Sequence, residues 1–245
     1  MDKQYYLESI KLLWKGAVRK VELSLLKLVP SKLAKWVLQR RGMVVGITSN
    51  RNFYETTVPV CVKSLIESGF PPQQIYFFIG GYDARYEKVD IGFGVNAYKC
   101  PHNSIDFTAL VSIIELELTE KYWFLVHDTV EFEKQFYDLI AKALFFRKKK
   151  VYSGPSMNIG CYDESAIERA SRELLTIKNS SKAWGVKTED RYIRHLPPIC
   201  TNVLELGVSD VYGSGVLRHV EHYKRAGLIK NKANKNIAEN FITDV

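Results

Sequence analysis

The chain has 245 residues, a formal net charge of +8 and a hydrophobic fraction of 46%. This composition is that of an ordinary globular protein and excludes a disordered or low-complexity chain. No apolar stretch approaches the ~20 residues that a membrane-spanning helix needs, and we expect no secretory signal. The length fits one large α/β domain with an appendage, or two small domains.

The positive charge is concentrated at the start of the chain. Residues 1–41 contain ten Lys or Arg against three Asp or Glu, so this segment carries seven of the eight surplus positive charges. The distribution argues against nucleic acid as a partner of the whole protein and favours a local anionic surface.

The same segment predicts helices. In residues 4–29 apolar side chains recur at three- and four-residue steps, which indicates an amphipathic helix. Pro30 ends it, and Ser31 can cap a second short helix. Basic residues opposite Trp and Leu are typical of a helix at a membrane interface, so we expect a cytoplasmic protein whose residues 1–41 associate peripherally with an anionic membrane. Packing of this segment on the main domain, or on a second subunit, is the alternative.

Four cysteines, Cys61, Cys100, Cys161 and Cys200, show no CxxC spacing. This pattern disfavours a zinc ribbon or a disulfide framework and predicts reduced, structural thiols.

A β-α-β unit is predicted from Met43 onward, in a domain of residues 42–245. Its strands cover residues 43–48 and 75–79, with a helix over 56–68 between them. The loop after the first strand has no GxGxxG, and the chain has no GxxxxGK[ST], which disfavours dinucleotide-binding Rossmann enzymes and P-loop NTPases.

Residues 122–126 form a short apolar run that leads directly into His127, Asp128 and Thr129. Such a run predicts a strand of a parallel sheet buried on both faces, and ligands bind at the carboxyl ends of such strands. Asp128 therefore either caps a following helix, which we expect over residues 133–147, or contacts a metal ion or diphosphate. His127 is expected to support it from a packed position.

The remaining elements are predicted in the same way. We expect a strand over residues 95–98, helices over 106–117 and 166–178, the second capped by Asp163 or Ser165, and a strand from Val151 that breaks into a glycine-flanked loop over 154–160. Residues 218–225 are polar and aromatic and precede a lysine-containing tail.

In this order of strands and loops the chain resembles GT-A-type glycosyltransferases. The resemblance rests on five stretches: Thr48-Ser49-Asn50-Arg51, Gly80-Gly81-Tyr82-Asp83, the strand ending in His127-Asp128-Thr129, the loop Gly154–Gly160, and Trp184-Gly185 followed by Glu189-Asp190. It implies an α/β fold with a mostly parallel sheet, and a nucleotide-diphosphate sugar held through Mn²⁺ or Mg²⁺. Such enzymes carry an acidic DxD motif after the fourth strand, whereas Val126-His127-Asp128 supplies one carboxylate.

The resemblance also implies roles for individual residues. Asp128 would bind the metal ion, and His219 or His222 would complete its shell, since Mn²⁺ also accepts imidazole. Asp190, with Glu189 as substitute, would act as the catalytic base of an inverting transfer. The donor would be contacted by Thr48, Asn50, Arg51, Asp83, Asp106, His127 and Lys224.

Each of these residues also has an ordinary structural reading. Asp190 could pair with Arg191 or Arg194, the two histidines could lie on a solvated helix face, and Asn50 with Arg51 could only close a turn. The expected acceptor is a hydroxyl of a glycan or a lipid-linked saccharide. A nucleotidyltransferase of related α/β fold, or a non-catalytic membrane-associated module, is the alternative function.

Overall fold

The computed structural model of the protein describes residue 25 and residues 28–104, 107–145, 159–178, 208–212, 219–223 and 227–232. Its central sheet contains β1 (Met43–Asn50), β2 (Ile75–Gly80), β3 (Glu87–Val89), β4 (Asn96–Lys99), β5 (Tyr122–His127) and β7 (Gly160–Asp163). The strand order is β3-β4-β2-β1-β5-β7, and the four inner strands are parallel, with antiparallel strands at both edges.

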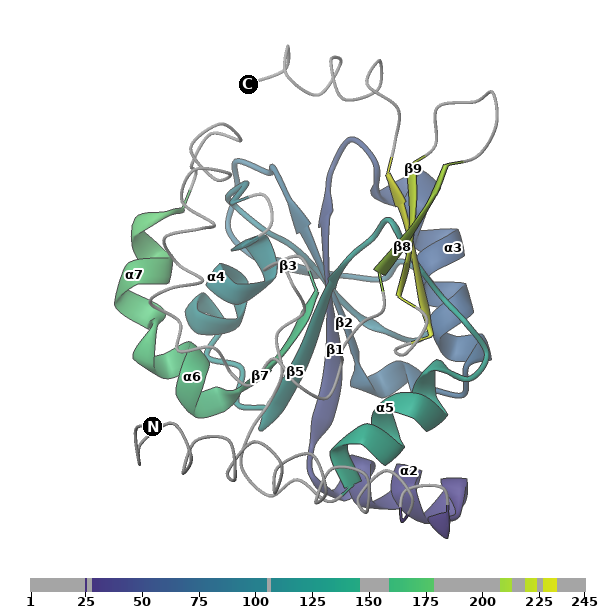
Figure 1. The fold of residues 1–245 in the computed structure, drawn as a ribbon. Coiled ribbons are helices and arrows are strands. Elements are labelled where there is room, and N and C mark those ends of the chain that lie inside the picture. Colours follow the sequence, from purple (N-terminus) through teal and green to yellow (C-terminus); the bar gives the residue numbers. More distant parts are fainter. Residues whose placement is uncertain are drawn as a thin grey trace, which may run out of the picture.

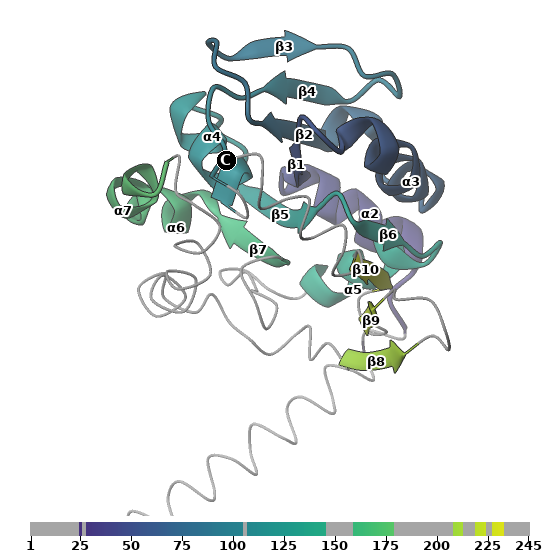
Figure 2. The same cartoon turned by 90° about the horizontal axis from the view of Figure 1, so that it is seen from above.

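Helices cover both faces of this sheet. They are α2 (Ser31–Arg40), α3 (Tyr54–Glu67), α4 (Thr108–Glu115), α5 (Phe136–Phe145), α6 (Glu164–Arg169) and α7 (Ser171–Thr176), with a short 3₁₀ turn over Pro72–Gln74. Figure 1 shows α4, α6 and α7 on one side of the sheet and α3 and α5 on the other, and Figure 2 shows the same layers from above. The predicted α/β class with a mostly parallel sheet flanked by helices is confirmed.

The first β-α-β unit follows the prediction closely. Every residue of β1 except the last is buried, and α3 buries Val58, Cys61 and Leu65 against the sheet. α3 begins two residues earlier than expected, which places Pro59 in its second turn. Gly69, with a φ of +89°, follows the end of α3 in the left-handed conformation that glycine adopts readily.

The chain after β5 differs from the prediction. It turns at Asp128 and Thr129, enters β6 (Val130–Phe132), and begins α5 only at Phe136. β6 is the first strand of a second, antiparallel sheet of order β6-β10-β9-β8, with β8 (Val208–Tyr212), β9 (His219–Tyr223) and β10 (Leu228–Lys232). The expected helix start at Glu133 was wrong because residues 130–132 pair with β10.

Two edge strands of the central sheet were not predicted. β3 is short and carries Glu87 and Lys88, a composition that suits an edge strand rather than a buried one. β7 begins at Gly160, where the sequence predicted only a loop, and the rest of that loop lies outside the described residues. Asp163 then caps α6 as predicted, because its Oδ1 accepts a hydrogen bond from the Ala166 amide at 2.7 Å.

The buried core joins both sheets and α2. Trp123, Phe124 and Val126 of β5 are at most 1% exposed and pack with β1, β2 and α5. α2 contributes Ala34 and Leu38 to this core. Ser31 is the first residue of α2 rather than its cap, because Pro30 occupies the capping position and no side chain caps the helix.

Candidate functional site at the carboxyl edge of the sheet

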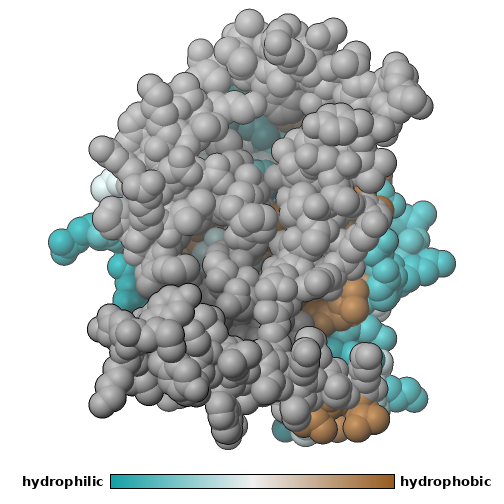
Figure 3. Space-filling view, in the orientation of Figure 1, coloured by the Kyte–Doolittle hydropathy of each residue, from teal (hydrophilic) through white to brown (hydrophobic). Residues whose placement is uncertain are grey.

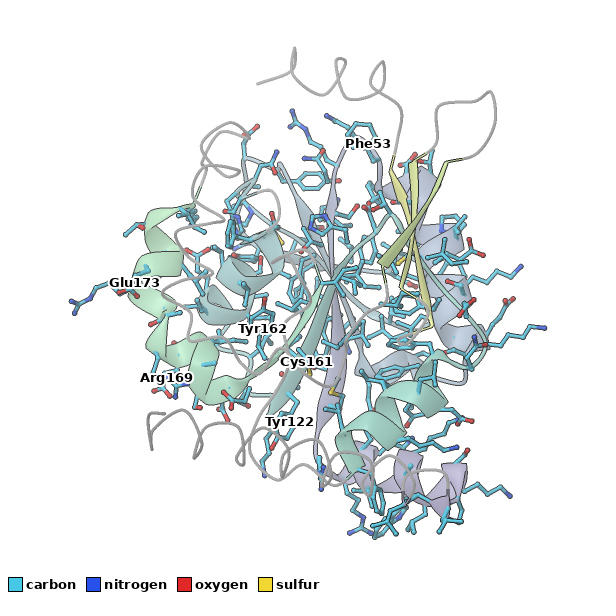
Figure 4. All side chains as sticks on the ribbon, in the orientation of Figure 1. Phe53, Tyr122, Cys161, Tyr162, Arg169 and Glu173 are labelled. Atoms are coloured by element: carbon cyan, nitrogen blue, oxygen red, sulfur yellow. The ribbon has the colours of Figure 1, made fainter. Side chains whose placement is uncertain are left out.

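The carboxyl ends of β1, β2 and β5 meet at one edge of the sheet because these strands are parallel. Thr48 of β1 lies opposite Phe78 of β2 on one side and His127 of β5 on the other. The start of α3 lies at the same edge, as the position of Phe53 in Figure 4 shows. Open α/β sheets bind their ligands at this edge.

Asp128 lies at the centre of this edge and is fixed by three hydrogen bonds. Its backbone N–H donates to the Thr48 carbonyl at 3.0 Å, and the Thr57 hydroxyl donates to its Oδ2 at 2.6 Å. The Ser49 hydroxyl donates to the same carboxylate oxygen. Ser49 of β1 and Thr57 of α3 thus orient the carboxylate, and among the described residues no hydrogen bond reaches its Oδ1.

The interpretation of Asp128 as a helix cap is wrong. The residues that follow it form a turn and then β6, and the next helix, α5, begins eight residues later at Phe136. No helix amide is therefore near enough in sequence for Asp128 to cap. Its hydrogen bonds run instead to Thr48 and Ser49 near the end of β1 and to Thr57 in the first turn of α3.

A buried thiol lies close to this carboxylate. Burial raises the pKa of Cys61 well above its usual value, and the negative charge of Asp128 raises it further. Cys61 is therefore a neutral thiol and offers no thiolate to a soft metal ion. The donors at this edge are carboxylate and hydroxyl oxygens, which suit Mg²⁺ or Mn²⁺. Cys100 and Cys161 are also buried free thiols, as predicted, and Cys200 lies outside the described residues.

Three residues that the sequence singled out lie at the end of β1 and directly after it. Thr48 is buried, and its hydroxyl accepts a hydrogen bond from the Ala109 amide in the first turn of α4 at 3.3 Å. Asn50 closes a turn, because its Oδ1 accepts from the Asn52 amide at 3.0 Å. Arg51 donates its backbone N–H to the Gly80 carbonyl at 2.9 Å, while its side chain is exposed. Asn50 thus shapes the loop, and Arg51 presents a cation at the edge.

The Gly80-Gly81 turn brings the end of β2 against this loop. Gly81 has a φ of +96°, and a Cβ there would lie 3.4 Å from Cγ of Arg51. The Gly81 amide donates to the His102 carbonyl at 2.9 Å, which ties the turn to the segment after β4. Asp83 follows in an exposed position.

A hollow of about 420 Å³ lies beside this turn, between the start of α3 and β3. Its lining includes Tyr54, Ile79, Glu87 and Lys99, of which Lys99 forms an ion pair with Glu87 at 3.4 Å. Burial raises the pKa of Tyr54, and its hydroxyl donates to Glu55 at 3.2 Å. The volume lies within the range of small-molecule sites.

Sequence reasoning missed a buried polar network behind the edge. His102, which follows β4, is 2% exposed. Its Nε2 lies 2.8 Å from the hydroxyl of Tyr86, which donates to Glu115 at 2.7 Å, and Lys178 donates to the same carboxylate at 2.6 Å. Burial lowers the pKa of His102 to about 4, so the ring is neutral at pH 7.

His219 and His222 lie on β9, so the interpretation of this segment as a helix face is wrong. Residue 130 of β6 pairs with residue 230 of β10, and residue 232 of β10 pairs with His219. Because β6 and β10 are antiparallel, His219 is at the end of β9 nearer to Asp128.

The other predicted site residues are not placed. Asp106, Glu189, Asp190 and Lys224 lie outside the described residues, as does the loop Gly154–Gly160 up to residue 158. Within the described residues no group of three His, Cys, Asp or Glu side chains is arranged to hold a metal ion. Asp128 is thus the one predicted metal ligand whose side-chain geometry the structure describes.

No protein-family model matches this sequence, and no curated protein matches it. Among solved structures, a glycosyltransferase involved in the glycosylation of the major capsid of PBCV-1 is similar to this chain with a TM-score of 0.37 and 9% identity. The match covers 63% of this chain and 78% of that chain. A similarity of this degree says nothing about the activity of this chain.

Proposed function

We propose that the protein is a glycosyltransferase that transfers a sugar from a nucleotide-diphosphate donor, assisted by a divalent metal ion. The observation that supports the proposal most is the geometry of Asp128. Its carboxylate lies at the ligand-binding edge of a parallel sheet, and two hydroxyl groups hold one of its oxygens. These hydrogen bonds fix the direction in which the carboxylate would meet a ligand.

The donor set fits a metal ion that is shared with a substrate. Mg²⁺ is commonly held by one or two carboxylates together with phosphate oxygens and waters, so Asp128 and a diphosphate could hold it without a three-residue protein cluster. When bound, the ion would neutralise charge on the leaving diphosphate. His219 is the better candidate for a further ligand than His222, because its end of β9 is two strands from residue 128, roughly 10 Å between backbones.

The neighbouring residues suit the rest of the donor. Arg51 is exposed at the same edge of the sheet and would pair with a diphosphate oxygen, and the start of α3, which has no side-chain cap, adds amide groups that favour an anion. The hollow lined by Tyr54 and Ile79 would take the nucleoside, with the tyrosine ring against the base. Asp83 would contact the ribose.

The catalytic base and the acceptor in this proposal are assigned from the resemblance of the sequence to GT-A-type glycosyltransferases. Asp190, or Glu189 in its place, would remove the proton of the acceptor hydroxyl, which gives inversion at the transferred carbon. Asp106 and Lys224 would contact the nucleoside and the diphosphate. The acceptor would be a glycan or a lipid-linked saccharide.

Donor binding tests the proposal without knowledge of the acceptor. The full chain is heated with UDP-, GDP- and dTDP-sugars, with and without Mn²⁺. A donor at ~100 times its dissociation constant adds about 2.7 kcal/mol to the free energy of unfolding, and Asp128→Asn should lose the metal-dependent part of that gain. Glu67→Gln, at the opposite end of α3 and exposed, removes the same charge and should keep it.

The product identifies the reaction class. Glycosyl transfer releases a nucleoside diphosphate, whereas nucleotidyl transfer from a nucleoside triphosphate releases pyrophosphate. If no nucleotide sugar stabilises the wild-type protein, with or without metal, the proposal is wrong.

A further inference from the structure

A second functional surface lies at the opposite edge of the sheet, on α2. This helix is firmly attached to the domain. Lys35 forms an ion pair with Asp138 of α5 at 2.8 Å and lies 4.9 Å from the ring centre of Tyr137. The guanidinium of Arg41 donates to the carbonyls of Leu144 and Phe145 at the end of α5. The outer face of α2 is therefore held in a fixed orientation.

That outer face exposes large apolar side chains. Leu33 is 45% exposed, Trp36 is 52% exposed, and Leu28, just before the helix, is 78% exposed. Leu33, Trp36 and Arg40 follow one another at three- and four-residue steps, so they form one stripe. Figure 3 shows hydrophobic surface beside hydrophilic surface at the lower edge of the molecule, where α2 lies in Figure 1.

The charges around this stripe have a single sign. Residues 28–41 contain Lys32, Lys35, Arg40 and Arg41 and no acidic residue. The Arg40 guanidinium lies 4.8 Å from the ring centre of Trp36, and Lys32 is exposed one turn before it. Trp and Leu next to Lys and Arg are the side chains that enter the interface of an anionic bilayer together.

We propose that Leu28, Leu33, Trp36, Lys32 and Arg40 form a docking surface for an anionic lipid bilayer. The apolar side chains enter the interface, and the two cations pair with phosphate groups of the lipids. The positive charge of this surface complements the negative charge of the lipid phosphates, and a protein surface with few acidic residues would lack that complementarity. In the part of the chain that the structure describes, no helix is long and apolar enough to cross a bilayer.

Docking through α2 would fix the orientation of the candidate site relative to the membrane. α2 precedes β1 directly, whereas Asp128 and Arg51 lie at the far end of that strand. Eight strand residues span roughly 25 Å, so the site faces away from the docked membrane. The proposed enzyme would then act on an acceptor that reaches it from the aqueous side. Because the two regions are separate, loss of docking leaves donor binding intact.

Sedimentation of the full chain with vesicles tests the proposal. Wild-type protein should bind vesicles of phosphatidylcholine with about a third of phosphatidylserine, and bind pure phosphatidylcholine much more weakly. Each lost cation should lower the partition coefficient about fivefold, so Lys32→Ala with Arg40→Ala should lower it about 25-fold. Trp36→Ala should lower it about tenfold or more, since it removes exposed apolar area.

Val60→Ala and Lys63→Ala on α3 are matched controls, because they remove one exposed apolar side chain and one exposed cation from a different surface. They should bind vesicles as the wild type does. Equal binding of the α2 variants and the wild type would overturn the proposal, as would equal binding to neutral vesicles. A dimer that Trp36→Ala converts to a monomer, without lipid, would show that this face binds a second copy instead.

Discussion

Protonation of His102 should limit the stability of the fold in mild acid. The ring is buried between Tyr86, Ser104 and Ser112, with Glu115, Lys178 and the Cys100 thiol as the nearest titratable groups. Burial outweighs the attraction of Glu115 and lowers the pKa of His102 to about 4. Since an unfolded histidine has a pKa of about 6.5, the unfolded chain takes up this proton first.

The size of the effect follows from the two pKa values. Stability from the neutral ring is fully present above pH 6.5 and is lost as the pH falls toward 4. The free energy of unfolding should fall by about 2 kcal/mol between pH 7 and pH 5, and by about 3 kcal/mol at pH 4. Glu115 acts only at lower pH: burial opposes its ionisation, but hydrogen bonds from Lys178 and Tyr86 lower its pKa below the usual range. The interval from pH 6.5 to 5 therefore separates the effect of His102 from that of Glu115.

Urea denaturation at several pH values, followed by circular dichroism, measures this loss. His102→Gln keeps a polar side chain but cannot take up the proton, so the slope between pH 6.5 and 5 should flatten even if the variant is less stable at pH 7. Tyr86→Phe is the matched control, because it removes a hydrogen bond from the same ring and leaves the histidine buried. If His102→Gln keeps the full slope, the assignment of the acid sensitivity to this ring is wrong.

Two further predictions concern the candidate site. Thr57→Val should lower the free energy of unfolding by about 1–2 kcal/mol in urea titration, because it removes a hydrogen bond to the charged Asp128. Thr56→Val, which removes only an exposed bond to the Phe53 carbonyl, should change it by less than half as much, and equal losses would contradict the reasoning. Asp190→Asn should lower the turnover number about 100-fold or more, with donor affinity unchanged, if Asp190 is the base. Near-wild-type turnover of a correctly folded variant would exclude that role.

The fold could be predicted where local patterns determine it. The buried runs of β1, β2 and β5 have no reasonable alternative to strands of a parallel sheet, and the helix between β1 and β2 shows a regular apolar face. The position of Asp128 at the carboxyl edge followed from that pattern alone. These elements need only their own residues and the right-handed connection rule.

The failures have a common physical cause, which is pairing between distant segments. β6 is three residues long and becomes a strand only because residues 228–230 pair with it. The strand β9, predicted as a helix face, likewise depends on both of its neighbours. The hydrogen-bond partners of His102 come from the segment before β3, the segment after β4, and α4, and Lys178, which pairs with Glu115, follows α7. No spacing along the sequence therefore indicates the network.

One carboxylate at the candidate site has a consequence for how a metal ion would bind. Asp128 receives its hydrogen bonds from the neutral hydroxyls of Ser49 and Thr57, and among the described residues no Lys or Arg pairs with it. A divalent cation bound there would pair with this carboxylate. A single carboxylate holds Mg²⁺ or Mn²⁺ weakly, however, because most of the ligands would be water. A diphosphate would replace several of these waters, so metal and donor should stabilise the protein together far more than either does alone.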